Sequence, residues 1–266
     1  MSVIDRGIAA VLIGAVALVA CGGQEPETGP GGGRGTARPD SGEPVLRWRM
    51  TGGIAGLGGP GSLPDFSLYG DGRAITGPRD GAPPPPLPVQ REYRLTPAAL
   101  QRLLGEARAA GLERSRTIGP DRIADAMVLE IRMGAARTRI VQPESQAGAP
   151  AVRFWKRLDP RGWSRADQAE PSRPYRSSRV AVLAGESPAA GGQRVSDWPL
   201  KRPLGRGEQA AGALCTVVTG DDRDTAVKHV ATADGDHRWR SGGKVYSVRL
   251  RPLLPDERTC QDVAKT

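Results

Sequence analysis

The sequence predicts an α+β fold in which antiparallel hairpins form one or more sheets, with one helix packed across each half. The first observation is that short segments alternate apolar and polar residues, as half-buried strands do. The second is that turn signals join two pairs of these segments into hairpins. The third is that one segment in each half repeats its apolar residues with the period of a helix, so each helix can cover one face of a sheet.

The first half supplies a single strand and two hairpins. Val45–Met50 alternates apolar and basic residues. Asp-Gly is a strong turn signal, and Gly134-Ala135 separates two further alternating segments. The predicted hairpin strands are Asp65–Tyr69 with Arg73–Thr76, and Met127–Met133 with Thr138–Val141.

The first-half helix begins after Thr96-Pro97, because threonine is a common N-cap and proline is tolerated in the first turn. Leu100, Leu103 and Leu104 fall on one face of this helix. Gly111 ends it. A helix with such a stripe must pack on a sheet, so we place it across the two hairpins.

The second half repeats this organisation with less regular connections. A helix is expected near Ala151–Leu158, and Asp221-Asp222 can cap another short helix. Residues 185–209 are broken by Gly and Pro and mark a candidate division into two subdomains. The expected strands are Arg179–Ala184, Leu214–Thr219 and Lys244–Leu250.

The N-terminus predicts export and a lipid anchor. Residues 8–20 are apolar but too few to span a bilayer, so residues 1–20 have the pattern of a signal peptide. Leu18-Val19-Ala20-Cys21 resembles a bacterial lipobox, which implies a diacylglyceryl group on Cys21. Residues 21–44 then form a flexible Gly/Pro-rich tether, and 45–266 the extracytoplasmic domain. The alternative is an ordinary signal peptide that contains a cysteine.

The remaining cysteines, Cys215 and Cys260, form an even pair with one connectivity. In an oxidising compartment they are expected to form a disulfide, which in the loop-entropy model stabilises the fold by roughly 4 kcal/mol. The alternative is a reactive thiol with His229 as its base.

The chain carries 38 Lys and Arg against 29 Asp and Glu, a net charge of +9. Removing residues 1–20 takes one charge of each sign and leaves this value unchanged. Basic residues interleave with Phe154, Trp155, Trp163 and Tyr175, a combination that is typical of proteins that bind single-stranded nucleic acid. Export argues against nucleic acid, which leaves an anionic envelope polymer; the alternative is a solvated basic surface. The candidate anion-binding residues are Arg153, Lys156, Arg157, Arg161 and Arg165.

No catalytic residue, metal site or cofactor is predicted. Gly56–Gly61 fits G-x-G-x-x-G, but Pro60, Gly61 and Pro64 block the helix that a dinucleotide site needs. His229 and His237 lack the spacing of a zinc site.

Two carboxylates offer an alternative reading as an enzyme. Asp71 and Asp125 could act as a hydrolytic pair if the fold brought them together. More often, an aspartate in Asp-Gly makes only a turn.

Several motifs together resemble a family of uncharacterised actinobacterial secreted lipoproteins. The resemblance covers most of the mature chain and implies export, lipidation and the disulfide, but no catalytic residue. The motifs are Phe66-Ser67-Leu68-Tyr69-Gly70-Asp71-Gly72-Arg73, the helix from Leu95-Thr96 to Ala109-Ala110-Gly111-Leu112, Asp125-Ala126, the Cys215 strand, and Arg251-Pro252-Leu253-Leu254-Pro255 up to Cys260.

These observations lead us to expect a non-enzymatic, lipid-anchored protein on the extracytoplasmic face of the cell membrane. It would bind or scaffold a component of the cell envelope, which could be an anionic polymer. The alternatives are a carboxylate-based envelope hydrolase and electrostatic capture of polymer by residues 153–179.

Overall fold

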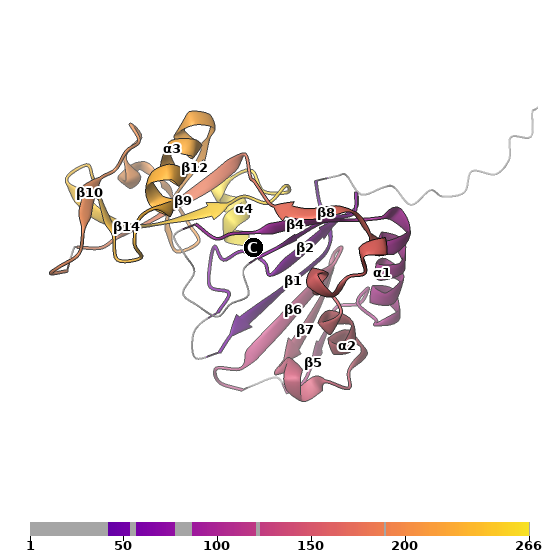
Figure 1. Ribbon diagram of the computed structural model, residues 1–266. Helices are drawn as coiled ribbons and strands as arrows, with labels where there is room; N and C mark the ends of the chain where they lie inside the picture. Colours follow the sequence, from indigo (N-terminus) through magenta and orange to yellow (C-terminus); the bar gives the residue numbers. More distant parts are fainter. Residues whose placement is uncertain (1–41, 54–56, 78–86, 121–122, 189, 266) are drawn as a thin grey trace, which may run out of the picture. The chain divides into compact units, whose positions relative to one another are not determined.

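The strands form two sheets, and the α+β prediction is confirmed (Figure 1). The computed structural model describes residues 42–53, 57–77, 87–120, 123–188 and 190–265. Within these residues one sheet has eight strands and the other six. Neighbouring strands are antiparallel apart from the parallel pairs β5–β7 and β10–β13.

The first sheet contains both predicted hairpins. The β2–β3 and β6–β7 hairpins turn where Asp71-Gly72 and Gly134-Ala135 predict, and β1 lies between them. In spatial order its strands are β5 (Arg116–Ile118), β7 (Ala136–Val141), β6 (Met127–Met133), β1 (Pro44–Gly52), β2 (Phe66–Tyr69), β3 (Arg73–Thr76), β4 (Arg91–Leu95) and β8 (Gln168–Pro174).

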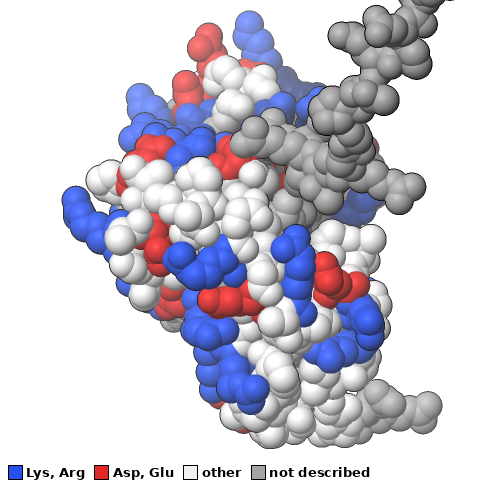
Figure 2. Space-filling view, turned by 90° about the vertical axis from the view of Figure 1, so that its right-hand side faces the viewer, with Lys and Arg blue, Asp and Glu red and all other residues white. Residues whose placement is uncertain are grey.

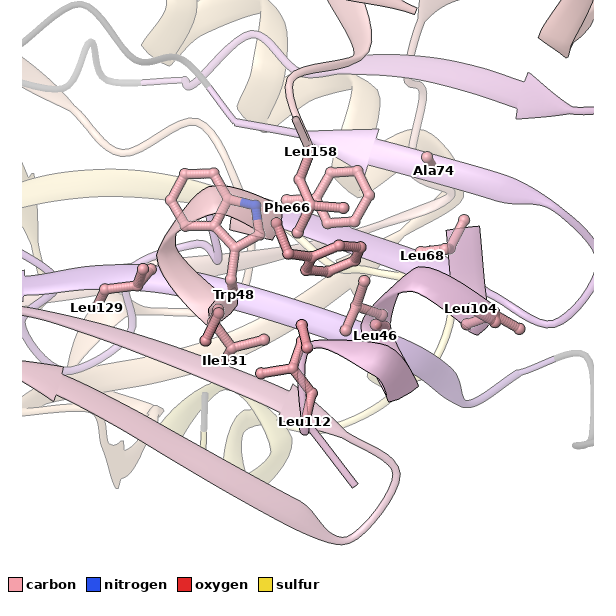
Figure 3. Packing of buried hydrophobic residues seen from close by; sticks show 14 of the residues in the cluster. Leu46, Trp48, Phe66, Leu68, Ala74, Leu104, Leu112, Leu129, Ile131 and Leu158 are labelled. Carbon is pink, nitrogen blue, oxygen red and sulfur yellow. The ribbon is translucent and has the colours of Figure 1, made fainter. Parts of the chain in front are cut away.

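Helices α1 (Pro97–Ala109) and α2 (Pro150–Lys156) cover one face of this sheet (Figure 1). The Thr96 hydroxyl accepts a hydrogen bond from Ala99 N at 3.2 Å, which confirms the predicted N-cap. Each large apolar side chain buried here contributes about 1.5–3 kcal/mol. Figure 3 shows the central residues, Leu46, Trp48, Phe66, Leu68, Ala74, Leu104, Leu112, Leu129, Ile131 and Leu158.

The other face of the first sheet carries no helix of the described residues, and its composition differs from one part to another. Over β2 and β3 it is covered by the segment Leu253–Glu257, where Leu254 packs against Tyr69 and Ile75. The Tyr69 hydroxyl donates a 2.7 Å hydrogen bond to Asp256. Over β1, β6 and β7 the alternation leaves mainly charged residues on this face.

The second sheet is covered by a helix on each face. Alternate residues of β9 enter two different cores, Val180 and Val182 with α3, and Ala181 and Leu183 with α4. The helices are α3 (Gly220–Ala231) and α4 (Cys260–Lys265). In spatial order the strands are β10 (Val195–Asp197), β13 (Arg238–Ser241), β14 (Lys244–Pro252), β9 (Arg179–Glu186), β12 (Ala213–Thr219) and β11 (Glu208–Ala210).

The structure adds elements to the predicted architecture. Each sheet packs with two helices and not one. The helix expected near Ala151–Leu158 is present as α2 and packs on the first sheet, and the short α4, which was not predicted, packs on the second. The strands β4, β5, β8, β10, β11 and β13 were also not predicted. Four short 3₁₀ helices connect the strands, Pro143–Gln146, Pro160–Gly162, Arg165–Asp167 and Leu204–Arg206.

The chain passes from one sheet to the other at residues 175–178, between β8 and β9. The segment 185–209, where we placed a candidate subdomain division, lies within the second sheet and contains β10 and part of β11. The described residues of both sheets belong to one compact unit.

Residues 1–41 lie outside the described residues, and with them the predicted signal peptide, Cys21 and most of the tether. Among the described residues, none of the helices has the length and apolar character needed to cross a bilayer.

Candidate functional site

The predicted disulfide is present. Cys215 on β12 and Cys260 at the start of α4 are bonded, with their Cα atoms 5.9 Å apart. Both residues are buried in the core between the second sheet and α4. The bond therefore fixes the C-terminal helix to the sheet. Because both sulfurs are used, the alternative of a reactive thiol with His229 is wrong.

The candidate anion-binding residues lie on the side of the first sheet that α1 and α2 cover, and most are already paired. Lys156 lies 3.1 Å from Glu144, Arg157 lies 3.2 Å from Glu106, and Arg161 lies 2.8 Å from Asp159. Arg153 donates to a backbone carbonyl, that of Gly148. Arg165 is exposed and makes no ion pair within the described residues.

A cleft of about 550 Å³ separates α1 from the segment that follows α2. Trp163 contributes apolar surface, and two ion pairs join its walls, Arg102 with Asp167 at 2.6 Å and Arg157 with Glu106 at 3.2 Å. The structure thus brings Lys156 and Arg157 together around a cleft, whereas Arg153, Arg161 and Arg165 do not line it. An anion entering here would have to displace a carboxylate from each arginine.

The charges seen from this side are mixed. Figure 2, which views the side on which α1 lies in Figure 1, shows Lys and Arg interspersed with Asp and Glu. Exposed ion pairs of this kind contribute about 0–1 kcal/mol each and leave little net field. The arrangement resembles a solvated, internally neutralised surface more than an anion site.

Asp71 and Asp125 are not brought together. The strand register places Tyr69 opposite Pro44 and Met127 opposite Gly52, so the two aspartates follow opposite ends of the nine-residue β1. At about 3.3 Å per residue this separates them by roughly 25 Å, far beyond the 5–10 Å of a glycosidase pair.

Asp71 has a structural role in its turn, whereas Asp125 lies at the protein surface. Asp71 accepts a hydrogen bond from Arg73 N at 3.0 Å, as an aspartate in a turn does, and lies 3.6 Å from Arg94. Asp125 is exposed and has a left-handed backbone with φ of 54°. The hydrolase alternative therefore loses the pair on which it was based.

The histidines also lie apart from any constellation of acids or thiols. His237 stacks on Trp239 at 4.7 Å, and burial together with Arg194 lowers the pKa of its imidazole. Within the described residues, no group of three His, Cys, Asp or Glu could hold a metal ion.

The structure gathers arginines on the face of the first sheet opposite α1 and α2. Residues paired across neighbouring strands share a face, and here two successive rows are cationic. One row joins Arg47, Arg132 and Arg137; the next joins Arg49, Glu130 and Arg139. We call these five arginines and Glu130, on β1, β6 and β7, the arginine face.

Glu130 organises the arginine face from its centre. Its side chain is only 7% exposed, and it accepts hydrogen bonds from Arg132 at 2.7 Å and from Arg137. Burial alone would raise the pKa of this carboxyl, but the two arginines outweigh burial and hold its pKa below its ordinary value. The carboxylate therefore stays charged and fixes the position of two guanidinium groups.

Arg47 is held by a second carboxylate. Its guanidinium contacts Asp256 at 2.8 Å and donates to the Ser67 hydroxyl at 2.9 Å. Asp256 belongs to the segment Leu253–Glu257 that covers the neighbouring part of the sheet. This segment is anchored in turn by the buried ion pair of Arg251 with Glu257, at 2.6 Å and 2.8 Å.

Arg49 and Arg139 flank Glu130 without pairing to it. Within the described residues, neither makes an ion pair. The Nε of Arg49 is buried and has no hydrogen-bond acceptor. Burial lowers the pKa of Arg49, and the repulsion of Arg132 and Arg137 adds to this, opposed by Glu130 and Asp65. An arginine nevertheless stays protonated at neutral pH.

Sequence reasoning overlooked this site although part of its signal was visible. The turn at Gly134-Ala135 implies that Arg132 faces Arg137 and that Glu130 faces Arg139. The missing step was the pairing of β1 with β6, which brings Arg47 and Arg49 alongside residues about 80 positions later.

Comparison with known proteins yields no further identification. The chain matches no protein-family model, and neither the curated proteins nor the solved structures include a significant match.

Proposed function

We propose that this chain is a lipid-anchored protein on the extracytoplasmic face of the membrane, where it binds an envelope component without catalysing a reaction. The proposed location rests on the lipobox-like residues Leu18–Cys21 and on the tether that follows them. The resemblance to actinobacterial secreted lipoproteins supports the same location.

The observation that carries this proposal is the disulfide between Cys215 and Cys260. Disulfides persist in oxidising compartments and are rare in a reducing cytosol. A stabilising disulfide in the second sheet therefore agrees with export, which the N-terminal sequence predicts from unrelated residues.

A binding role is favoured over catalysis by the arrangement of the charged groups. The Asp71 and Asp125 carboxylates lie at opposite ends of β1, and the carboxylates of the cleft are paired with arginines. The net charge of +9 favours an anionic partner, and an envelope polymer is the partner class that export makes accessible.

The proposed location can be tested by membrane fractionation and intact-mass measurement of the wild type and of Cys21→Ser. We expect the wild-type protein in the membrane fraction, with a diacylglyceryl mass on an N-terminal Cys21 and no free thiol. Cys21→Ser should lose both the lipid and membrane retention, because no other anchor is predicted.

The matched control replaces the other two cysteines, Cys215→Ser with Cys260→Ser. This variant should keep the lipid and the membrane location while losing the disulfide. A wild-type protein that is soluble and unlipidated, with two free thiols, would contradict the proposal.

A further inference from the structure

The arginine face presents its cations on a regular lattice. Neighbouring strands lie about 4.8 Å apart, and alternate residues of one strand about 6.7 Å apart. The two rows thus place cationic side chains at short, repeating intervals across β1, β6 and β7. A ligand that repeats its negative charge at a similar spacing could contact several guanidinium groups at once.

Two guanidinium groups of the arginine face are preorganised and still accessible. Arg132 and Arg137 remain 47% and 56% exposed while Glu130 holds them. An arginine has five N–H donors, so each can bind Glu130 and also a second oxyanion. Side chains that are already ordered lose less conformational entropy when a ligand binds.

The charge balance of this surface is positive. The five arginines are opposed by Glu130, Asp65 and Asp256 among the described residues, which leaves an excess of two positive charges. Part of this excess lies on Arg132 and Arg137, which share the single charge of Glu130. Arg49 and Arg139 carry the cations that make no ion pair within those residues. An incoming anion would not have to displace a protein carboxylate, unlike at the cleft beside α1.

We propose that the arginine face binds an extended phosphodiester polymer, with Arg49 and Arg139 as its principal contacts. Guanidinium groups bind the two free oxygens of a phosphodiester in a forked geometry. A short polyol between phosphates repeats the charge at about the spacing of the two rows. An exposed sheet face suits a polymer better than one small anion, because affinity there depends on several simultaneous contacts.

This proposal deepens the proposed function, since it rests on the location in the envelope to make such a polymer accessible. It predicts binding that weakens as salt rises, because each neutralised phosphate releases a counterion.

The test measures affinity by fluorescence anisotropy, with labelled synthetic poly(glycerol phosphate) as the probe and the full-length protein in nonionic detergent. Salt is varied between about 50 and 200 mM. The variant is Arg49→Gln with Arg139→Gln. We expect affinity to fall about tenfold for each arginine, because each substitution removes one charge-assisted hydrogen bond. The salt dependence of binding should also become shallower.

The matched control is Arg153→Gln with Arg165→Gln. It removes the same charge from the side of α1 and α2, again from arginines that make no ion pair within the described residues. Its affinity should stay within about twofold of the wild type, because screening weakens charges that do not touch the ligand. Thermal melting of both variants verifies that they are folded.

Three results would overturn the proposal: no binding by the wild type, equal losses in the two double variants, or tighter binding of poly-L-glutamate than of the phosphodiester probe. The measurement does not depend on lipidation. A protein that binds the probe but carries no lipid contradicts only the proposed function, and a lipidated protein that does not bind contradicts only this inference.

Discussion

The two faces of the first sheet are built from the same strands but differ in every property that matters for function. On one face of β1 and β6, Trp48 and Ile131 lie buried beneath α1 and α2. On the other face, their neighbours Arg49 and Arg132 belong to the two charged rows of the arginine face. Successive side chains of a strand point to opposite faces, so one set of alternate residues stabilises the fold and the other set is available to a ligand.

The two basic surfaces of the molecule also differ. In the basic run of residues 153–165, Arg157 and Arg161 are paired with carboxylates. On the arginine face, arginines distant in sequence outnumber their carboxylates. A run of basic residues therefore does not indicate an anion-binding site until the partners of those residues are known.

The largest effect is expected where Leu253–Glu257 covers the face of the first sheet opposite α1 and α2. Arg251→Met removes the guanidinium that neutralises the Glu257 carboxylate, and both side chains are only 2% exposed. We expect the free energy of unfolding in urea to fall by about 3–5 kcal/mol. Combining Arg251→Met with Glu257→Leu should restore most of this loss, since an apolar pair needs no counter-charge. A double variant less stable than the single one would contradict this account.

A smaller loss is expected on the apolar face. Ile131→Ala removes a fully buried side chain beneath the helices and should lower the free energy of unfolding by about 2–5 kcal/mol. The control on the other face, Arg139→Ala, should change it by less than about 1 kcal/mol. Similar losses in both variants would show that the two faces are not separable in this way.

The smallest effect is expected at Glu130. Its pKa is held below its ordinary value, so its carboxylate stabilises the folded state above the unfolded pKa, and this contribution disappears as pH falls through the folded pKa. Arg49, Arg132, Arg137 and Arg139, which face it, keep their charge throughout. Glu130→Gln should therefore be less stable than the wild type by about 1–2 kcal/mol at pH 7. Unfolding curves in which this difference does not shrink as the pH is lowered would refute the assignment.

The parts of the fold that could be predicted are those encoded locally. Asp71-Gly72 makes its turn and Thr96 caps its helix through neighbours a few residues away, and only one disulfide was available to Cys215 and Cys260. Two of the elements that escaped prediction lack such local signals. The helix α4 is short, and the strand β8 pairs with β4 across more than 70 residues.

The candidate site could be predicted only in part, for the same reason. The β6–β7 hairpin register follows from one turn, but nothing local indicates that β1 joins β6. The basic run from Arg153 to Arg165 was misleading because its partners lie elsewhere, such as Glu106 for Arg157 and Glu144 for Lys156. A count of charges along the chain cannot include such pairs.

The most direct test of the central claim is an NMR titration with the phosphodiester probe, following the arginine Nε–Hε resonances of the full-length protein in detergent. We expect the resonances of Arg49 and Arg139 to shift most, with smaller shifts at Arg132 and Arg137 as they bind a second oxyanion. Unchanged resonances on the arginine face, together with shifts at Arg153 and Arg165, would contradict the account and place the anion site beside α2.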